Sequence, residues 1–298
     1  MRTATKLGLY GLTLAAVFAG ALGVGRLVGP DLARTAGGEP GHTGGLSEPG
    51  HGPSAALAIP GGLQVSDSGY RLVLQTGSLT AGAPVDFRFR IVGPDGVPVT
   101  HYTATHEKDL HLIVARRDLT GFQHLHPTRA GDGTWSTGLT VAEAGQYRVF
   151  ADFQPAGRDR PLILGSDVPA AGAYQPRTLP AAARAAEVDG YRVELAGDLQ
   201  PGTASKLTVR VSRAGAAVTD LQPYLGAYGH LVVLRQGDLA YLHVHPDDGP
   251  IGSGPEVSFY VEVPSAGVYR LFLDFQHTGT IHTAAFTAVA GESGGHGS

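Results

Sequence analysis

Two short stretches of the sequence each place a pair of histidines, one residue apart, directly before a proline. They are HLHP at residues 124–127 and HVHP at residues 243–246. The chain has only 13 histidines, so a second copy of this pattern calls for an explanation. Imidazole nitrogens are preferred ligands of Zn(II) and Cu(II) in proteins. The pairs therefore indicate metal binding as the first chemistry to consider.

Each pair has a third histidine at the same distance upstream. HLIVARRDLTGFQHLHP, residues 111–127, and HLVVLRQGDLAYLHVHP, residues 230–246, align without a gap, and all three histidines and the proline coincide. Side chains two positions apart on a strand project from the same face. The two histidines of each pair are therefore expected to point together, and the third must approach them from a neighbouring strand.

A hairpin would supply that neighbouring strand in the second copy. Gly237-Asp238 is a favourable two-residue turn. A turn centred there predicts that His230 lies directly opposite His245, with His243 diagonal to it. Cβ atoms of opposite residues lie about 4.5–5.5 Å apart and those of diagonal residues about 7–8 Å, which lets three imidazoles converge on one ion.

The same construction applies to the first copy. A turn centred on Asp118-Leu119 predicts that His111 lies opposite His126. Each half of the chain is thus expected to hold one three-histidine metal site. The six predicted ligands are His111, His124, His126, His230, His243 and His245.

The remaining composition narrows the choice of metal. The chain has no cysteine, and its single methionine is Met1, so thiolate sites and thioether-rich Cu(I) sites are excluded. Imidazole clusters suit Cu(II) or Zn(II), and the general affinity order places Cu(II) before Zn(II). A copper or zinc ion is therefore the expected cofactor, and sequestration or delivery of that ion the expected role.

A structural role for the histidines remains the alternative. Both faces of the predicted strands are apolar, so the histidines could be buried and bonded to backbone groups or to Asp152 and Asp274, which occupy equivalent positions in the two halves. Those aspartates could equally orient a ligand histidine. The protein would then be a non-metal binding or scaffolding module at the cell surface. His277 and His282 have no counterparts in the first half and are expected at the surface.

The chain is not expected to be an enzyme or to bind nucleic acid. It carries no GxSxG, P-loop or GxGxxG motif, and HEKDLH at 106–111 lacks the HExxH spacing of zinc proteases. The net charge is −4, and the basic residues form no stripe along the sequence.

Further repeats show that the whole of each half is duplicated. Residues 70–74 (YRLVL) resemble 191–195 (YRVEL), and residues 144–154 (AGQYRVFADFQ) resemble 266–276 (AGVYRLFLDFQ). A repeat of this length indicates two domains and not a solenoid. Short alternating runs broken by Gly, Pro and Asp predict antiparallel strands. For the second half these are 190–196, 205–213, 229–235, 239–245, 256–263, 267–275 and 280–288.

Seven strands at this spacing are typical of an immunoglobulin-like sandwich. The predicted fold class is all-β, with two tandem immunoglobulin-like antiparallel β-sandwiches preceded by one transmembrane helix. The predicted divisions are an N-terminal anchor or signal segment at 1–30, a Gly/Pro-rich linker at 31–58, the first sandwich at 59–169, a linker at 170–187, the second sandwich at 188–290, and a disordered tail at 291–298.

The transmembrane prediction rests on residues 7–25, LGLYGLTLAAVFAGALGVG, which carry no charge. The run is long enough to span a bilayer, and Arg2 and Lys6 before it favour a cytoplasmic N-terminus. We expect a single-pass protein of the cell membrane with the bulk of the chain extracytoplasmic.

With this anchor, repeat and histidine pattern, the sequence resembles exported bacterial immunoglobulin-like modules, namely the YtkA-like domains and, more distantly, the CopC-type copper-resistance domains. The likeness rests on residues 111–127 and 230–246 and covers about residues 60–290. It implies extracytoplasmic copper binding or delivery, with a metal-handling protein as the possible partner.

Overall fold

Every regular element in the described part of the chain is a β-strand. The structure is a computed structural model that describes residues 59–242, 244–247 and 253–291. Its twenty strands are β1 to β20, which confirms the all-β prediction for these residues. No helix among them is long and apolar enough to cross a membrane. The predicted membrane segment at 7–25 lies outside the described residues.

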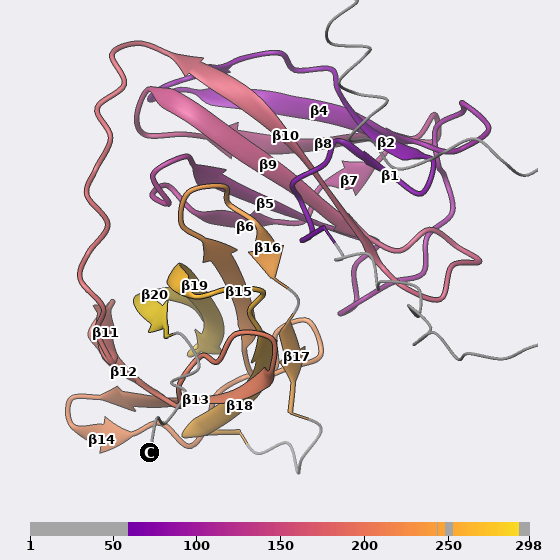
Figure 1. Cartoon of the computed structure of the whole chain (residues 1–298). Coiled ribbons are helices and arrows are strands. Elements are labelled where there is room, and N and C mark those ends of the chain that lie inside the picture. The colour runs from indigo at the N-terminus through magenta and orange to yellow at the C-terminus, as the bar shows by residue number, and fades with distance from the viewer. Residues whose placement is uncertain (1–58, 243, 248–252, 292–298) are drawn as a thin grey trace, which may run out of the picture. The chain divides into compact units, whose positions relative to one another are not determined.

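The first half forms two sheets, visible in Figure 1. One has the order β1-β2-β4-β8-β7 and the other β3-β10-β9-β5-β6. The strands are β1 Ser66–Asp67, β2 Tyr70–Leu74, β3 Leu79–Thr80, β4 Pro84–Val92, β5 Leu110–Arg116, β6 Gln123–Leu125, β7 Thr128–Arg129, β8 Thr134–Thr140, β9 Gly145–Phe153 and β10 Leu162–Ala171.

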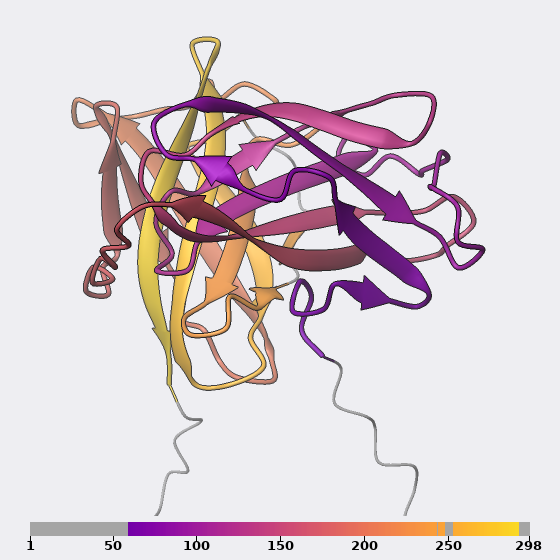
Figure 2. The same cartoon turned by 90° about the horizontal axis from the view of Figure 1, so that it is seen from above.

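The second half repeats this arrangement. One sheet has the order β11-β12-β13-β18-β17, with β14 beside β13, and the other has the order β16-β15-β19-β20. Figure 2 shows the long β19–β20 hairpin in yellow. The strands are β11 Ala185–Val188, β12 Tyr191–Ala196, β13 Ala204–Arg213, β14 Ala216–Ala217, β15 His230–Arg235, β16 Tyr241–Leu242, β17 Val244–Pro246, β18 Glu256–Glu262, β19 Gly267–His277 and β20 Thr280–Ala290.

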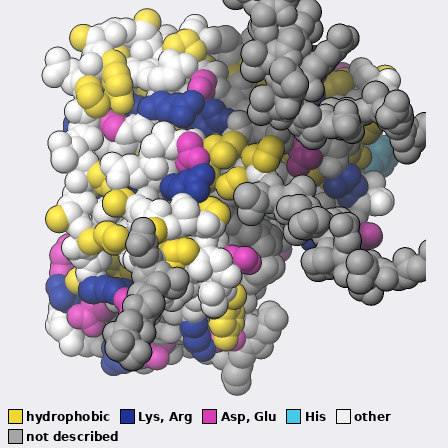
Figure 3. Space-filling model, viewed as in Figure 1, with side chains coloured by type: hydrophobic (Ala, Val, Ile, Leu, Met, Phe, Trp, Pro, Cys, Tyr) yellow, Lys and Arg dark blue, Asp and Glu magenta, His cyan; other side chains and the backbone are white. Residues whose placement is uncertain are grey.

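Alternation along the strands places the core between the two sheets of each half. On β4, Phe87, Phe89 and Ile91 are fully buried, whereas Asp86 and Arg88 on the opposite face are exposed. Period-two alternation of this kind is what a strand with one buried and one solvated face requires. On the outer face seen in Figure 3, basic and acidic side chains are interspersed.

The order of the strands is that of an immunoglobulin-like sandwich. In the first half, β2-β4-β8-β7 corresponds to the A-B-E-D sheet and β10-β9-β5 to the G-F-C sheet. Each half also has a tyrosine corner at the start of its F strand. The Tyr147 hydroxyl donates to the Glu143 carbonyl at 2.8 Å, and the Tyr269 hydroxyl donates to the Ser265 carbonyl at 2.7 Å. The predicted sandwich type is thus confirmed from topology.

The predicted register of the first histidine hairpin is correct. Leu112 pairs with Leu125, and Ile113 pairs with His124. One residue beyond the end of β6, the same register puts His126 opposite His111, as the turn centred on Asp118-Leu119 predicts, and the two ring centroids are 5.0 Å apart. Both members of the downstream pair are therefore held next to the strand that carries the upstream histidine.

The second hairpin begins in the predicted register but does not keep it. Leu234 pairs with Tyr241 and Val233 pairs with Leu242, as a turn at Gly237-Asp238 requires. The chain then crosses to the other sheet, where His245 pairs with Tyr260. The prediction that His245 lies opposite His230 is therefore wrong. The crossing lets β17 pair with β18 while Val244 packs against the core of the second half.

The histidine-bearing faces of β5 and β15 belong to one apolar cluster that joins the two halves. The rings of Phe122 and Phe272 stack in it with centroids 4.0 Å apart. Its fully buried members are Ile113, Ala115, Leu119, Phe150, Val232, Leu234, Leu239 and Phe272. The two histidine hairpins consequently meet each other and do not face solvent separately.

Candidate metal centre

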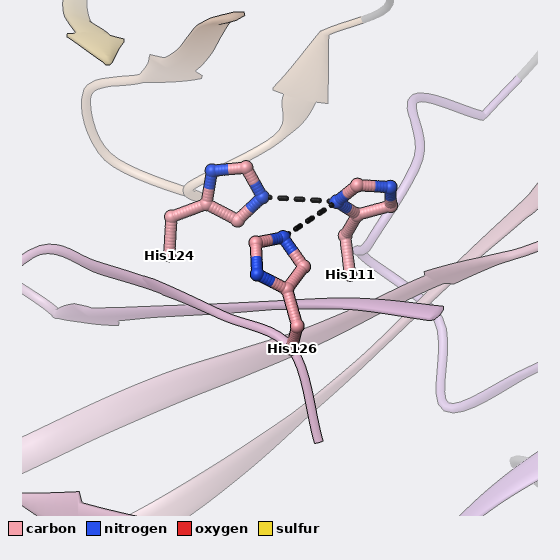
Figure 4. A group of neighbouring side chains, drawn as sticks. All are labelled: His111, His124 and His126. Carbon is pink, nitrogen blue, oxygen red and sulfur yellow. Dashed lines mark hydrogen bonds between the residues drawn. The ribbon is translucent and has the colours of Figure 1, made fainter. Parts of the chain in front are cut away.

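Three histidines of the first half converge on one point. His111 lies on β5, His124 lies on β6, and His126 follows β6 directly. The His111 Nδ1 atom is 3.0 Å from His124 Nε2 and 3.2 Å from His126 Nε2. One nitrogen from each ring lies within 4.8 Å of the other two. Figure 4 shows the three rings turned toward one another, and we call this group the triad.

The outward nitrogens of the triad are held by other groups. His111 Nε2–H donates to the Thr105 carbonyl at 2.9 Å, and His124 Nδ1–H donates to a carboxylate oxygen of Asp274 at 2.8 Å. His126 Nδ1 is 3.4 Å from the Tyr224 hydroxyl. A carbonyl and a carboxylate only accept hydrogen bonds, so they fix the protons of His111 and His124 on the outer side. Metal-binding histidines are oriented in this way.

His111 Nδ1 and His124 Nε2 lie 3.0 Å apart, and in neutral rings each would direct a lone pair toward the other. A cation between them, either a proton or a metal ion, removes the repulsion. Burial lowers the pKa of His111 to about 3 and that of His126 to about 4, so both rings are neutral at pH 7. Two nitrogens bound to one tetrahedral ion at about 2.0–2.1 Å lie about 3.3–3.4 Å apart, close to the separations seen here.

The carboxylate that orients the triad comes from the other half of the chain. Asp274 lies on β19, where it pairs through its backbone with His230. Its side chain instead accepts from His124 and from the Thr283 hydroxyl, the latter at 2.6 Å. The sequence identifies Asp274 as a residue that could orient a ligand histidine, but not that it serves the opposite half.

Asp152, the counterpart of Asp274, has a different partner. It pairs through its backbone with His111, and its carboxyl group accepts from the Tyr241 hydroxyl at 3.4 Å. Burial raises the pKa of Asp152 to about 6. The two equivalent aspartates thus contact different types of residue across the boundary between the halves.

The second predicted cluster is only partly described. His230 is buried, and its Nε2–H donates to the Tyr224 carbonyl at 2.7 Å, as His111 does to Thr105. Burial lowers the pKa of His230 to about 4. His243 lies outside the described residues, and only the backbone of His245 is described. A three-histidine site in the second half therefore stays a prediction.

A cavity of about 130 Å³ adjoins the triad and is lined by both halves. His111 and His124 contribute to it from the triad, and His106 and His230 contribute from beyond it. Sequence reasoning gave His106 no role, because it has no histidine counterpart in the second half. A signal that could have identified His106 is its position five residues before His111, in the tight turn at residues 105–108.

His277 and His282 lie elsewhere, and the expectation that they are surface residues is wrong. Their exposed fractions are 9% and 6%. His277 Nδ1 is 2.7 Å from the Tyr191 hydroxyl, and His282 Nδ1–H donates to Asp189 at 2.8 Å. Both rings pack against Tyr191, which accounts for their burial.

The chain belongs to a family of domains of unknown function. Two segments, residues 64–164 and 186–292, match the family described as "Domain of unknown function (DUF8832)". Together they make up more than half of the chain. No curated protein matches the sequence. The finer resemblance to YtkA-like and CopC-type domains is not supported by this match and stays a prediction.

Solved structures with some similarity come from several kinds of protein. The Escherichia coli adhesin FdeC is 15% identical at a TM-score of 0.25, and the match covers 77% of this chain and 65% of that one. A Salmonella alpha-2-macroglobulin is 13% identical at a TM-score of 0.27, covering 78% and 15%. The chicken CNTN1 FN1–FN3 domains are 10% identical at a TM-score of 0.20, covering 78% and 68%. These scores carry no argument about function.

Proposed function

We propose that this protein binds a transition-metal ion, Cu(II) before Zn(II), through His111, His124 and His126. The observation that carries the proposal is the pair of inward nitrogens of His111 and His124, 3.0 Å apart, whose rings donate their protons outward. A divalent ion satisfies all three inward nitrogens at once. The donor set is imidazole alone, and the general affinity order at such a set favours Cu(II).

The proposed role is sequestration or delivery of the ion. His111 and His124 also line the cavity, which leaves room for a water molecule or for a ligand from a partner at the fourth coordination position. A site that hands over its metal needs an open position of this kind. We further propose, from residues 7–25 and the linker that follows, that the protein is anchored in the cell membrane with both sandwiches outside, where a metal-handling protein would be the partner.

A purely structural triad is the competing function, and one observation favours it. The Asp274 carboxylate beside His124 could stabilise a proton shared between His124 and His111, and that proton would replace the metal. The protein would then be a binding or scaffolding module at the cell surface whose histidines stabilise the fold.

Metal titration of the full chain separates the two functions. Under metal binding, Cu(II) or Zn(II) at 100 times the dissociation constant should stabilise the fold by about 2.7 kcal/mol. The double variant His124→Ala/His126→Ala should lose the part of this gain that the triad supplies, whereas His101→Ala, at an exposed histidine, should keep all of it. A structural role predicts no gain for the wild type and a lower melting temperature for the double variant in either condition.

A further inference from the structure

A second pair of imidazoles beside the triad has the spacing of the triad itself. Within the triad, the ring centroids lie 5.3, 5.0 and 4.8 Å apart. The rings of His106 and His230 lie 5.1 Å apart. Two imidazoles bound to one tetrahedral ion at about 2.0–2.1 Å have centroids about 5.2 Å apart. The distances from this pair to the triad are longer, at 6.1 Å for His106 to His111 and 6.3 Å for His230 to His124.

His230 is already oriented as a ligand would be. Its Nε2–H donates to a backbone carbonyl, that of Tyr224, in the same way as His111 donates to Thr105. The proton is therefore on the outer nitrogen, and Nδ1 keeps its lone pair. The sequence assigned His230 to a cluster within its own half, but the structure places it beside His106 of the other half.

His106 is held in place by a turn that its sequence does not favour. His106 and Glu107 have φ angles of 48° and 62° within the turn closed by Thr105 and Lys108. Non-glycine residues seldom adopt such angles. The equivalent turn of the second half carries Leu225 and Gly226 at the corresponding positions. A histidine at this point therefore adds an imidazole that the fold itself does not need.

The space around the pair can hold an ion. His106 and His230 both line the cavity of about 130 Å³, together with Asp152 and Tyr241. A cavity holds one water molecule in about 10–15 Å³ of such volume, so an ion and its remaining water ligands fit. His106 is an exposed residue that also lines the cavity, which gives an ion a route into it.

We propose that His106 and His230 bind a second Cu(II) or Zn(II) ion, one ligand from each half of the chain, next to the ion held by the triad. This inference rests on the proposed function, since it assigns a second ion to the same cavity. The protein would then carry a two-ion centre at the boundary between its halves.

The stoichiometry of metal binding to the full chain tests the inference. Equilibrium dialysis against Cu(II), and separately against Zn(II), should give at least two ions for the wild type. His106→Leu introduces the residue type found in the equivalent turn and should lose one ion while the triad ion remains. His230→Gln should lose the same ion, and His101→Ala should lose none.

The outcomes separate the inference from the proposed function. Stoichiometry that is unchanged in both His106→Leu and His230→Gln overturns the second site and leaves the triad site standing. The second site is also overturned, and the triad site stands, if the wild type binds one ion and only His124→Ala/His126→Ala loses it. A wild type that binds no ion overturns both. Near-ultraviolet circular dichroism of each variant should match that of the wild type, which shows that a lost ion reflects a lost ligand and not a lost fold.

Discussion

The two copies of the seventeen-residue histidine motif carry the same three histidines, but their strands pair differently in the two halves. In the first half, Leu125 still pairs with Leu112, so the histidines on either side of it remain beside His111. In the second half, the equivalent Val244 has already crossed to pair with Val261 in the other sheet. A gapless alignment of side chains thus does not guarantee the same strand pairing, and the structure describes a compact triad for the first copy.

The turns of the two hairpins differ as well. In the first, Arg116 and Asp118 form an ion pair whose side chains are 1% and 5% exposed. In the second, Arg235 pairs with Asp238, one position further along the turn, with side chains 21% and 39% exposed. The first hairpin, which carries the triad, is therefore fixed by a buried ion pair, and the second is fixed by a more solvated one.

The largest difference between the halves should appear when these ion pairs are broken. Asp118→Asn should destabilise the fold by about 3 kcal/mol, because it leaves Arg116 buried with only Glu143 as an anionic partner. Asp238→Asn should cost less than about 1 kcal/mol, as expected for a solvated pair. Urea denaturation measures both. Equal losses would show that the two turns do not differ in the way described.

The next difference concerns the two aspartates on the F strands. Asp274→Asn should weaken metal binding at the triad about 10–100-fold, the usual cost of removing a group that orients a ligand histidine. Asp152→Asn should weaken the triad's affinity much less, because the Asp152 side chain accepts its hydrogen bond from Tyr241 and acts on His124 only through its charge. Competition titration with a chelator measures both affinities. A similar loss in the two variants would contradict the cross-half orientation of His124.

The tyrosine corners should behave alike, which makes them a control for the shared fold. Tyr147→Phe and Tyr269→Phe each remove one hydrogen bond to a backbone carbonyl. Each should cost about 1 kcal/mol. Thermal unfolding of the two variants measures the loss. A large inequality would show that the two sandwiches are not equivalent at this corner.

The last effect is a pH dependence at the first turn. Burial raises the pKa of Asp118, but hydrogen bonds from Arg116, Arg177 and Thr120 outweigh it and lower the pKa to about 2. The unfolded chain therefore takes up a proton at Asp118 before the folded chain does, and stability is lost as pH falls from about 4 toward 2. Asp118→Asn should be less sensitive to pH in this window. A parallel pH profile for wild type and variant would refute the assignment.

Much of the fold could be predicted because short-range patterns in the sequence determine it. Alternation marks the strands, and the register of Leu112 with Leu125 follows from the position of the turn. The crossing after Leu242 could not be predicted, since it depends on pairing with a strand fourteen residues or more downstream. The contacts of His106 with His230 and of Asp274 with His124 were also hidden, because both depend on how the two halves pack against each other.

X-ray absorption spectroscopy of the full chain loaded with one equivalent of Cu(II) or Zn(II) tests the triad most directly. We expect three imidazole nitrogens at about 2.0–2.1 Å with the multiple scattering of histidine rings. In His124→Ala/His126→Ala, which keeps the proposed second site at His106 and His230, fewer imidazole nitrogens should remain. A first shell of oxygen atoms alone in the wild type, or an unchanged number of imidazole nitrogens in the double variant, would contradict binding at the triad.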